Sequence, residues 1–180
     1  LRSVLRAAMN DWEWIERVPR VKLLHEAAGR VRFLTADEAR RLIAELPEHM
    51  ASMVGFSMLT GLRQRNVREL RWSQVDLDRR AVWVHAHEAK ARKGIPVPLP
   101  DEAVKILQAE RGKHEEFVFT YQGQPIRWVN NSAWKSALKR AGISDFRWHD
   151  LRHTWATWHA QAGMTPIHEL QNLGGWASPG

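Results

Sequence analysis

The chain has 180 residues, a formal net charge of +7 and no cysteine. Its 44% hydrophobic and 26% charged residues are ordinary for a globular domain, which excludes a disordered or fibrous protein and allows one well-buried core. Disulfides, thiol catalysis and cysteine-ligated zinc are excluded, and we expect a cytoplasmic protein. No apolar run approaches the roughly 18 residues of a membrane-spanning helix. The excess of lysine and arginine favours a polyanionic partner, with nucleic acid as the first candidate.

Residues 1–32 are expected to be the end of one unit followed by a basic linker. The apolar residues Leu1, Leu5, Met9 and Trp12 recur at helical spacing, and Pro19 interrupts the basic stretch that follows. Because the chain begins with leucine rather than methionine, we expect a fragment of a longer protein. The first helix would pack on a preceding domain or, alternatively, on the domain that follows.

Residues 33–180 are expected to form one mostly α-helical domain with a small antiparallel β-sheet, an α+β fold. It opens with a capping box in which Thr35 and Glu38 satisfy amide groups at a helix N-terminus. Apolar periodicity and caps predict helices from Thr35, over 50–59, 66–70, 102–110, 128–140 and 149–162, and from Thr165 onward.

The sheet is expected between residues 72 and 99. Segments 81–85 and 95–99 are typical of two antiparallel strands joined by the basic turn 90–94. Pro96 and Pro98 place the second strand at a sheet edge, because proline has no amide hydrogen to donate. A further short strand is expected at 117–119.

One cluster with chemical potential is Thr60–Arg63, where an arginine follows a helix-ending glycine. An arginine at such a junction can present its planar guanidinium group to a phosphate. Taken alone, a solvated cation at a helix C-terminus is the commoner reading.

A second cluster is the sequence from His149 to His153. Helical spacing puts His149, Arg152 and His153 on one face of the first turn, where backbone amides and the helix dipole favour an anion. Leu151 and Trp155 would take the buried side. An ordinary polar helix face is one alternative. Zinc bound by the two histidines is another, disfavoured by the arginine between them and by an aspartate where zinc proteases have glutamate.

The third cluster is the basic turn that contains Lys90. A lysine whose pKa is lowered by nearby arginines is a plausible general acid, whereas the bland alternative is an exposed charged hairpin. Two arginines, a lysine and a histidine suit a phosphodiester, whose transition state carries extra negative charge. No carboxylate cluster is available for magnesium, so we expect phosphoryl transfer by a protein nucleophile with no metal and no cofactor.

Four motifs then follow one another: Thr60–Arg63 with 69–76, Lys90 ahead of 97–99, His149–His153, and Leu173–Trp176. In this order, over residues 34–176, they resemble the catalytic domain of the tyrosine recombinases, and phage integrases in particular. The resemblance implies DNA strand cleavage and rejoining through a 3′-phosphotyrosyl intermediate, on double-stranded attachment sites and as a tetramer. It also implies that residues 1–32 end a preceding DNA-binding domain.

The resemblance assigns roles residue by residue. Arg63 and Arg152 would clamp the scissile phosphate, and Lys90 would protonate the leaving 5′ oxygen. His149 would assist proton transfer. Trp176 would pack against the phosphate and donate its indole hydrogen to it, although an isolated tryptophan is more often a core residue. Contacts with the DNA backbone are expected from Arg65, Arg68, Arg92, Lys93, Arg127, Lys135, Lys139 and His153.

Two departures from the family pattern concern the site. Asn66 stands where the family often has an acidic residue, which we expect to tune the site without abolishing it. The nucleophilic tyrosine is expected shortly beyond Trp176, whereas the one tyrosine of this chain is Tyr121. The fragment is therefore expected to bind DNA without forming the covalent link. The alternatives are a catalytically inactive DNA-binding accessory protein and a histidine-based metal hydrolase.

Overall fold

The computed structural model describes residues 2–19, 32–84, 95–129, 131–163 and 165–174. These residues belong to two compact units, Leu1–Arg30 and Val31–Gly180. Within the described ranges, no helix is both long and apolar enough to cross a membrane.

The first unit contains one helix, α1 (Arg2–Asn10), among its described residues. The helix ends in a turn in which the Trp12 amide donates to the Ala7 carbonyl at 3.0 Å. The rings of Trp12 and Trp14 contact each other, with centroids 4.8 Å apart. Trp12 therefore lies just past the helix whose apolar face it was expected to extend.

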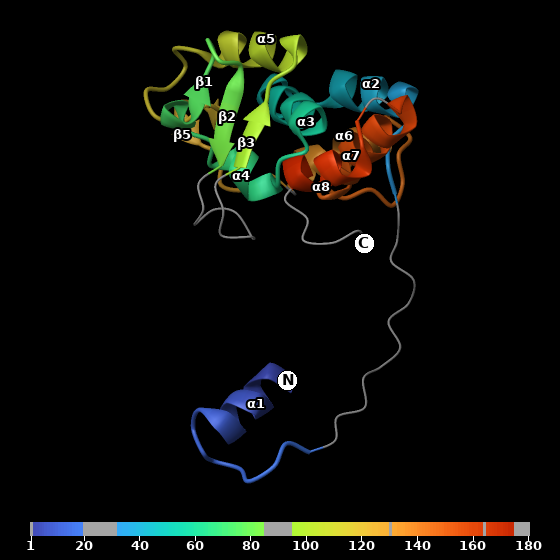
Figure 1. The fold of residues 1–180 in the computed structure, drawn as a ribbon. Helices are drawn as coiled ribbons and strands as arrows, with labels where there is room; N and C mark the ends of the chain where they lie inside the picture. Colours follow the sequence, from blue (N-terminus) through green and yellow to red (C-terminus); the bar gives the residue numbers. More distant parts are fainter. Residues whose placement is uncertain (1, 20–31, 85–94, 130, 164, 175–180) are drawn as a thin grey trace. The chain divides into compact units, whose positions relative to one another are not determined.

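Helix α3 (Glu48–Thr60) is at the centre of the second unit (Figure 1). It is apolar on nearly every side, as a helix covered all round must be, and Met53, Val54 and Phe56 are completely buried. The helices that pack against it include α2 (Ala36–Glu45), α5 (Asp101–Glu110) and α7 (Asp150–Ala162).

The predicted capping box at Thr35 is confirmed. The Thr35 hydroxyl accepts from the Glu38 amide at 3.2 Å, and the Glu38 carboxylate accepts from the Thr35 amide at 2.9 Å. Arg32 donates to the same carboxylate at 2.6 Å. This hydrogen bond, together with those from Thr35, lowers the pKa of Glu38 to about 2.

A three-stranded antiparallel sheet follows the 3-10 helix η1 (Trp72–Gln74), in the order β1 (Val75–Asp76), β2 (Ala81–Val84), β3 (Ile95–Pro98). The strand with the two prolines lies at an edge, as predicted. The basic turn 90–94 lies outside the described residues.

The strand expected at 117–119 is displaced. Phe117 makes an isolated bridge with Arg71, and a small hairpin forms later, from β4 (Thr120–Tyr121) and β5 (Gln124–Pro125). Val118 and Phe119 are instead buried in the core without forming a strand. A short run of buried apolar residues has the same sequence pattern as a strand, which explains the prediction.

The helix expected from residue 128 begins later, as α6 (Ser132–Arg140). The Asn131 side chain caps it by accepting from the Trp134 amide at 3.0 Å. Residues 126–129, which include Trp128, form a loop.

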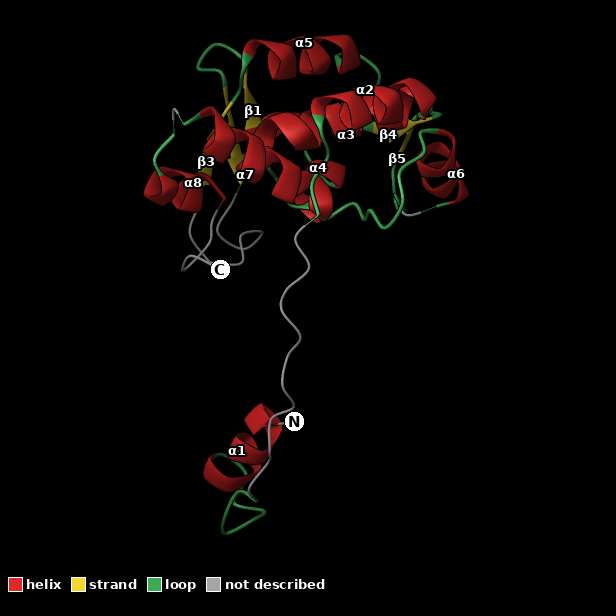
Figure 2. Cartoon of the chain, turned by 90° about the vertical axis from the view of Figure 1, so that its right-hand side faces the viewer, coloured by secondary structure: helices red, strands yellow, loops and turns green. Residues whose placement is uncertain are grey.

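Two short helices lie at one edge of the unit: α4 (Gln64–Arg68) and α8 (Ile167–Gly174). Figures 1 and 2 both show this edge opposite the one formed by α5. Helix α4 begins two residues before its predicted start, directly after Arg63. Arg63, one of the residues expected to carry chemistry, is therefore the N-cap of this helix.

Candidate active site

The turn that ends α3 admits glycine alone. Gly61 has a φ of +62°, in the left-handed region, and its amide donates to the Ser57 carbonyl at 2.9 Å. A Cβ atom here would lie 2.4 Å from ring atoms of Trp155. The close approach of α7 and the backbone geometry therefore both require this glycine, and the turn delivers Arg63 to the N-cap of α4.

Arg152 reaches the same turn from α7. Its guanidinium Nη1 donates to the Gly61 carbonyl at 2.7 Å, and only 4% of the residue is exposed. Burial, and then the positive charge of Arg63, lower the pKa of Arg152 to about 10. The two arginines thus repel each other at the Gly61 turn, and a bound anion would offset that repulsion.

His149 and His153 flank this positive cluster on the first turn of α7. His149 is the N-cap residue, and its ring lies edge-on to that of His153 with centroids 5.0 Å apart. Partial burial and then the charges of His153, Arg152 and Arg63 lower the pKa of His149. The ring nevertheless keeps contact with solvent. A neutral, accessible imidazole beside two arginines is suited to accept or relay a proton.

The first turn of α7 is held rigidly. The buried Asp150 carboxylate accepts from the Arg147 amide at 2.8 Å, while the buried Thr154 hydroxyl accepts from the Leu34 amide at 3.0 Å. Trp158 donates its indole hydrogen to the Leu34 carbonyl at 2.9 Å. As predicted, Leu151 and Trp155 face the core. These bonds fix the face that carries the histidines and the buried arginine.

The remaining predicted site residues fall into three groups. Lys90, Arg92, Lys93 and Trp176 lie outside the described residues. Arg65, Arg68 and Arg127 line one groove beside α4. Lys135 and Lys139 project from α6 and line a separate shallow hollow, away from the other three. Asn66, at the position where the family often has an acidic residue, is nearly buried in α4.

Several contributors were missed from the sequence. Nothing local indicated that Trp155 would close against Gly61, or that Thr154 would accept from a residue 120 positions earlier. Glu69 belongs to the predicted motif 69–76, but its ion pairs were not predicted. It pairs with Arg65 at 2.7 Å and also with Arg68, and thereby orients both arginines.

The chemical capacity of this site is anion binding with proton transfer. Two arginines converge on one turn, one of them buried, and two imidazoles border them. Among the residues that the structure describes, no three His, Cys, Asp or Glu side chains gather as a metal ion would need. The arrangement fits a phosphate group or phosphodiester.

Comparison with known proteins identifies the family. A family model described as the phage integrase family matches residues 32–180. The chain belongs to the phage integrase family. The integrase of Salmonella phage P22 is 41% identical over 191 residues, an alignment that covers 99% of this chain and 49% of that protein. The chain spans about half the length of the relatives it matches.

Solved integrase structures share the fold. The Tn1549 transposon integrase, in a complex with a circular intermediate DNA, superposes with a TM-score of 0.78 at 19% identity, over 98% of this chain and 69% of that one. The catalytic domain of bacteriophage HP1 integrase superposes with a TM-score of 0.62 at 23% identity, over 83% of each chain. The predicted fold, mostly α with a small antiparallel sheet and like the catalytic domain of a tyrosine recombinase, is confirmed.

Proposed function

We propose that this chain is the catalytic part of a site-specific DNA recombinase of the tyrosine type, an integrase. The observation that carries the proposal is the convergence of Arg63 and the buried Arg152 on the Gly61 turn, with His149 beside them. Membership of the phage integrase family and the positive charge of the chain support it.

In the proposed reaction, a tyrosine oxygen attacks the scissile phosphorus and the bond to the 5′ oxygen breaks. Arg63 and Arg152 hold the non-bridging oxygens, whose charge grows in the transition state. His149 assists removal of the tyrosine proton, and Lys90 gives a proton to the leaving 5′ oxygen. Trp176 donates its indole hydrogen to the phosphate. In the second half-reaction, a 5′ hydroxyl of a partner duplex attacks the phosphotyrosyl bond and releases the tyrosine, so bond energy is conserved.

The proposed substrate is double-stranded DNA carrying attachment sites. The Tn1549 integrase was solved with DNA, which supports this assignment. Contacts with the DNA backbone are proposed for the exposed or half-exposed basic side chains Arg65, Arg68, Arg127, Lys135, Lys139 and His153, and for Arg92 and Lys93. Such contacts require affinity that falls steeply with salt. We propose a tetramer on DNA and a cytoplasmic location for the intact protein.

The preceding residues 1–32 are proposed to end a DNA-binding domain and to link it to the catalytic domain, and the nucleophilic tyrosine is proposed to follow Gly180. The sequence retains all five side chains proposed to act on the phosphate, namely Arg63, Lys90, His149, Arg152 and Trp176. Their presence favours catalysis over a purely accessory DNA-binding role.

The test is covalent trapping by the full-length protein on a nicked attachment-site duplex. The wild type should give a protease-sensitive protein–DNA adduct. Arg63→Ala and Arg152→Ala should reduce the adduct at least 100-fold, because each substitution removes a positive charge that stabilises the negative charge of the developing phosphorane. Arg79→Ala, which removes an exposed arginine of the β1–β2 turn, is the matched control and should match the wild type. Binding of the same duplex with no adduct from the wild type would establish the accessory role instead.

A further inference from the structure

The loop before α6 exposes a tryptophan. Trp128 is 79% exposed, although its neighbour Val129 is 4% exposed and Ile126 is half-buried. The most exposed other tryptophan of the described second unit, Trp83, is 43% exposed. Covering this indole would remove apolar surface from water, so a ligand that stacks on it gains that free energy.

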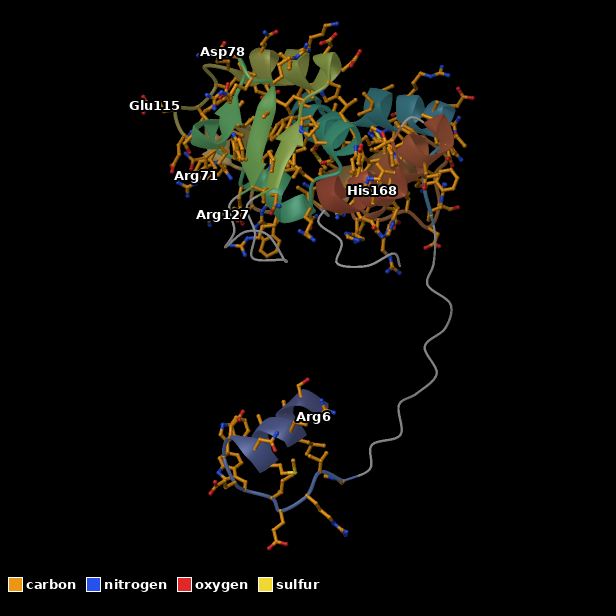
Figure 3. All side chains as sticks on the ribbon, in the orientation of Figure 1. Arg6, Arg71, Asp78, Glu115, Arg127 and His168 are labelled. Carbon is orange, nitrogen blue, oxygen red and sulfur yellow. The ribbon has the colours of Figure 1, made fainter. Side chains whose placement is uncertain are left out.

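The surroundings of Trp128 are strongly basic. It lines a groove with four arginines and one glutamate, Arg65, Arg68, Arg71, Arg127 and Glu69. Partial burial raises the pKa of Glu69, but hydrogen bonds from Arg65 and Arg68 outweigh it and hold that pKa below its usual value. Glu69 therefore stays ionised and orients two of the arginines. Figure 3 shows Arg127 and Arg71 on one flank of the unit, with Glu115 and then Asp78 farther along the same flank.

The loop is anchored on both sides of Trp128. Arg68 donates from Nη1 to the Arg127 carbonyl at 2.7 Å, and Asn131 caps α6 through its bond to the Trp134 amide. Val129 is inserted in the core. The described backbone next to the indole is thus held by the Arg68 bond on one side and by the buried Val129 on the other, which reduces the entropy lost when the indole meets a ligand.

The groove lies next to the candidate active site. Helix α4 begins directly after Arg63 and carries both Arg65 and Arg68. Five residues from Arg63 to Arg68, at about 1.5 Å each, span about 7.5 Å, which corresponds to roughly two nucleotides along a DNA strand. A strand held at Arg63 therefore reaches the groove within a few nucleotides.

We propose that Trp128 is a stacking platform for a base that has left its pair near the reacting phosphate, with Arg65, Arg68 and Arg127 on the flanking phosphates. The proposal rests on the proposed function, because exchange between duplexes requires the nucleotides next to the cut to unpair. An aromatic face among arginines has the composition of a single-strand site: stacking tolerates any base, and the charges follow the backbone. In intact duplex DNA the base faces are covered, so Trp128 acts after unpairing.

The first experiment needs no catalysis. The 180-residue chain is titrated with a short single-stranded oligonucleotide containing 2-aminopurine, by anisotropy and base fluorescence, at several salt concentrations. Trp128→Ala should weaken binding about 5- to 150-fold, the effect of one lost base stack. Trp128→Phe should recover most of that loss, and Trp83→Ala should match the wild type. The slope of log affinity against log salt concentration should be the same for Trp128→Ala as for the wild type. For Arg127→Ala its magnitude should fall by about 0.7, because one phosphate contact is removed.

The second experiment uses the full-length protein and its covalent adduct. Joining of a supplied 5′-hydroxyl strand should slow more in Trp128→Ala than adduct formation does, and 2-aminopurine two nucleotides from the cut should become brighter without the indole. Equal oligonucleotide affinity for Trp128→Ala and the wild type would overturn the stacking proposal, as would equal losses of cleavage and joining. Absence of any wild-type adduct would instead refute the proposed function, while the oligonucleotide titration still decides the role of Trp128.

Discussion

Substitution of Gly61 by alanine tests how the candidate site is assembled. Gly61 ends α3 with a φ of +62°, and an added Cβ would stand 2.4 Å from the Trp155 ring. Its carbonyl is also the acceptor for Arg152. The change therefore strains the backbone, pushes α7 away and displaces a guanidinium group proposed to bind phosphate.

The expected magnitude has two parts. A left-handed conformation costs a residue with a Cβ about 1–2 kcal/mol, and overpacking at a rigid contact adds about 1–3 kcal/mol. Gly163→Ala is the matched control, because Gly163 also ends a helix, at a φ of +67°, but no atom of the described residues lies within 4 Å of the added Cβ. Gly61→Ala should thus destabilise the domain by about 2–5 kcal/mol, and Gly163→Ala by only about 1–2 kcal/mol.

Urea unfolding followed by circular dichroism measures both free energies of unfolding, and equal slopes in urea validate the comparison. In the full-length protein, Gly61→Ala should also lose adduct formation, whereas Gly163→Ala should keep it. Equal destabilisation by the two substitutions would refute the argument that α7 packs against this turn.

Three further predictions concern single side chains. Arg152→Met should leave the free energy of unfolding within about 1 kcal/mol of the wild type, because the lost hydrogen bond is offset by removal of a desolvated charge. Inorganic phosphate should raise the unfolding temperature of the wild type but not that of Arg152→Met. Strong destabilisation by the substitution would contradict this prediction. The lowered pKa of Glu38, about 2 against an ordinary 4.5, means that its stabilisation is complete above pH 4.5 and is lost as the pH falls toward 2. Glu38→Gln should therefore lose at most about 3 kcal/mol at neutral pH and show a flatter acid unfolding profile, whereas an unchanged profile would exclude the Arg32–Glu38 pair as the cause. NMR titration should place the pKa of His149 below 6.5, and inorganic phosphate should raise it, since a bound anion favours the imidazolium; no movement with phosphate would place the anion elsewhere.

The parts of the fold that were predictable depend on local chemistry. The capping box at Thr35, the edge position of the strand with Pro96 and Pro98, and the helix closed by Gly163 each follow from neighbouring residues. The predicted start of α6 was wrong. Apolar residues from Trp128 onward continue its helical pattern, whereas the Asn131 cap decides where the helix begins.

The candidate site was predictable as a set of residue types but not as an arrangement. The motif order indicated that Arg63, His149 and Arg152 act together, and their mutual electrostatic effects agree with that proximity. The burial of Arg152 could not be foreseen, because it depends on an acceptor 91 residues away at Gly61. The exposure of Trp128 was equally hidden, since a tryptophan in sequence usually indicates a core position.

The most direct test of the central claim, that Arg63 and Arg152 neutralise a phosphodiester, combines protein and DNA substitutions. Adduct formation by the full-length protein is measured on a nicked duplex with a natural scissile phosphate and on one with an uncharged methylphosphonate there. Arg63→Ala and Arg152→Ala should fail on the phosphate but recover much of the lost adduct on the methylphosphonate, because no charge then needs to be neutralised. Equal failure of both variants on both substrates would contradict the account.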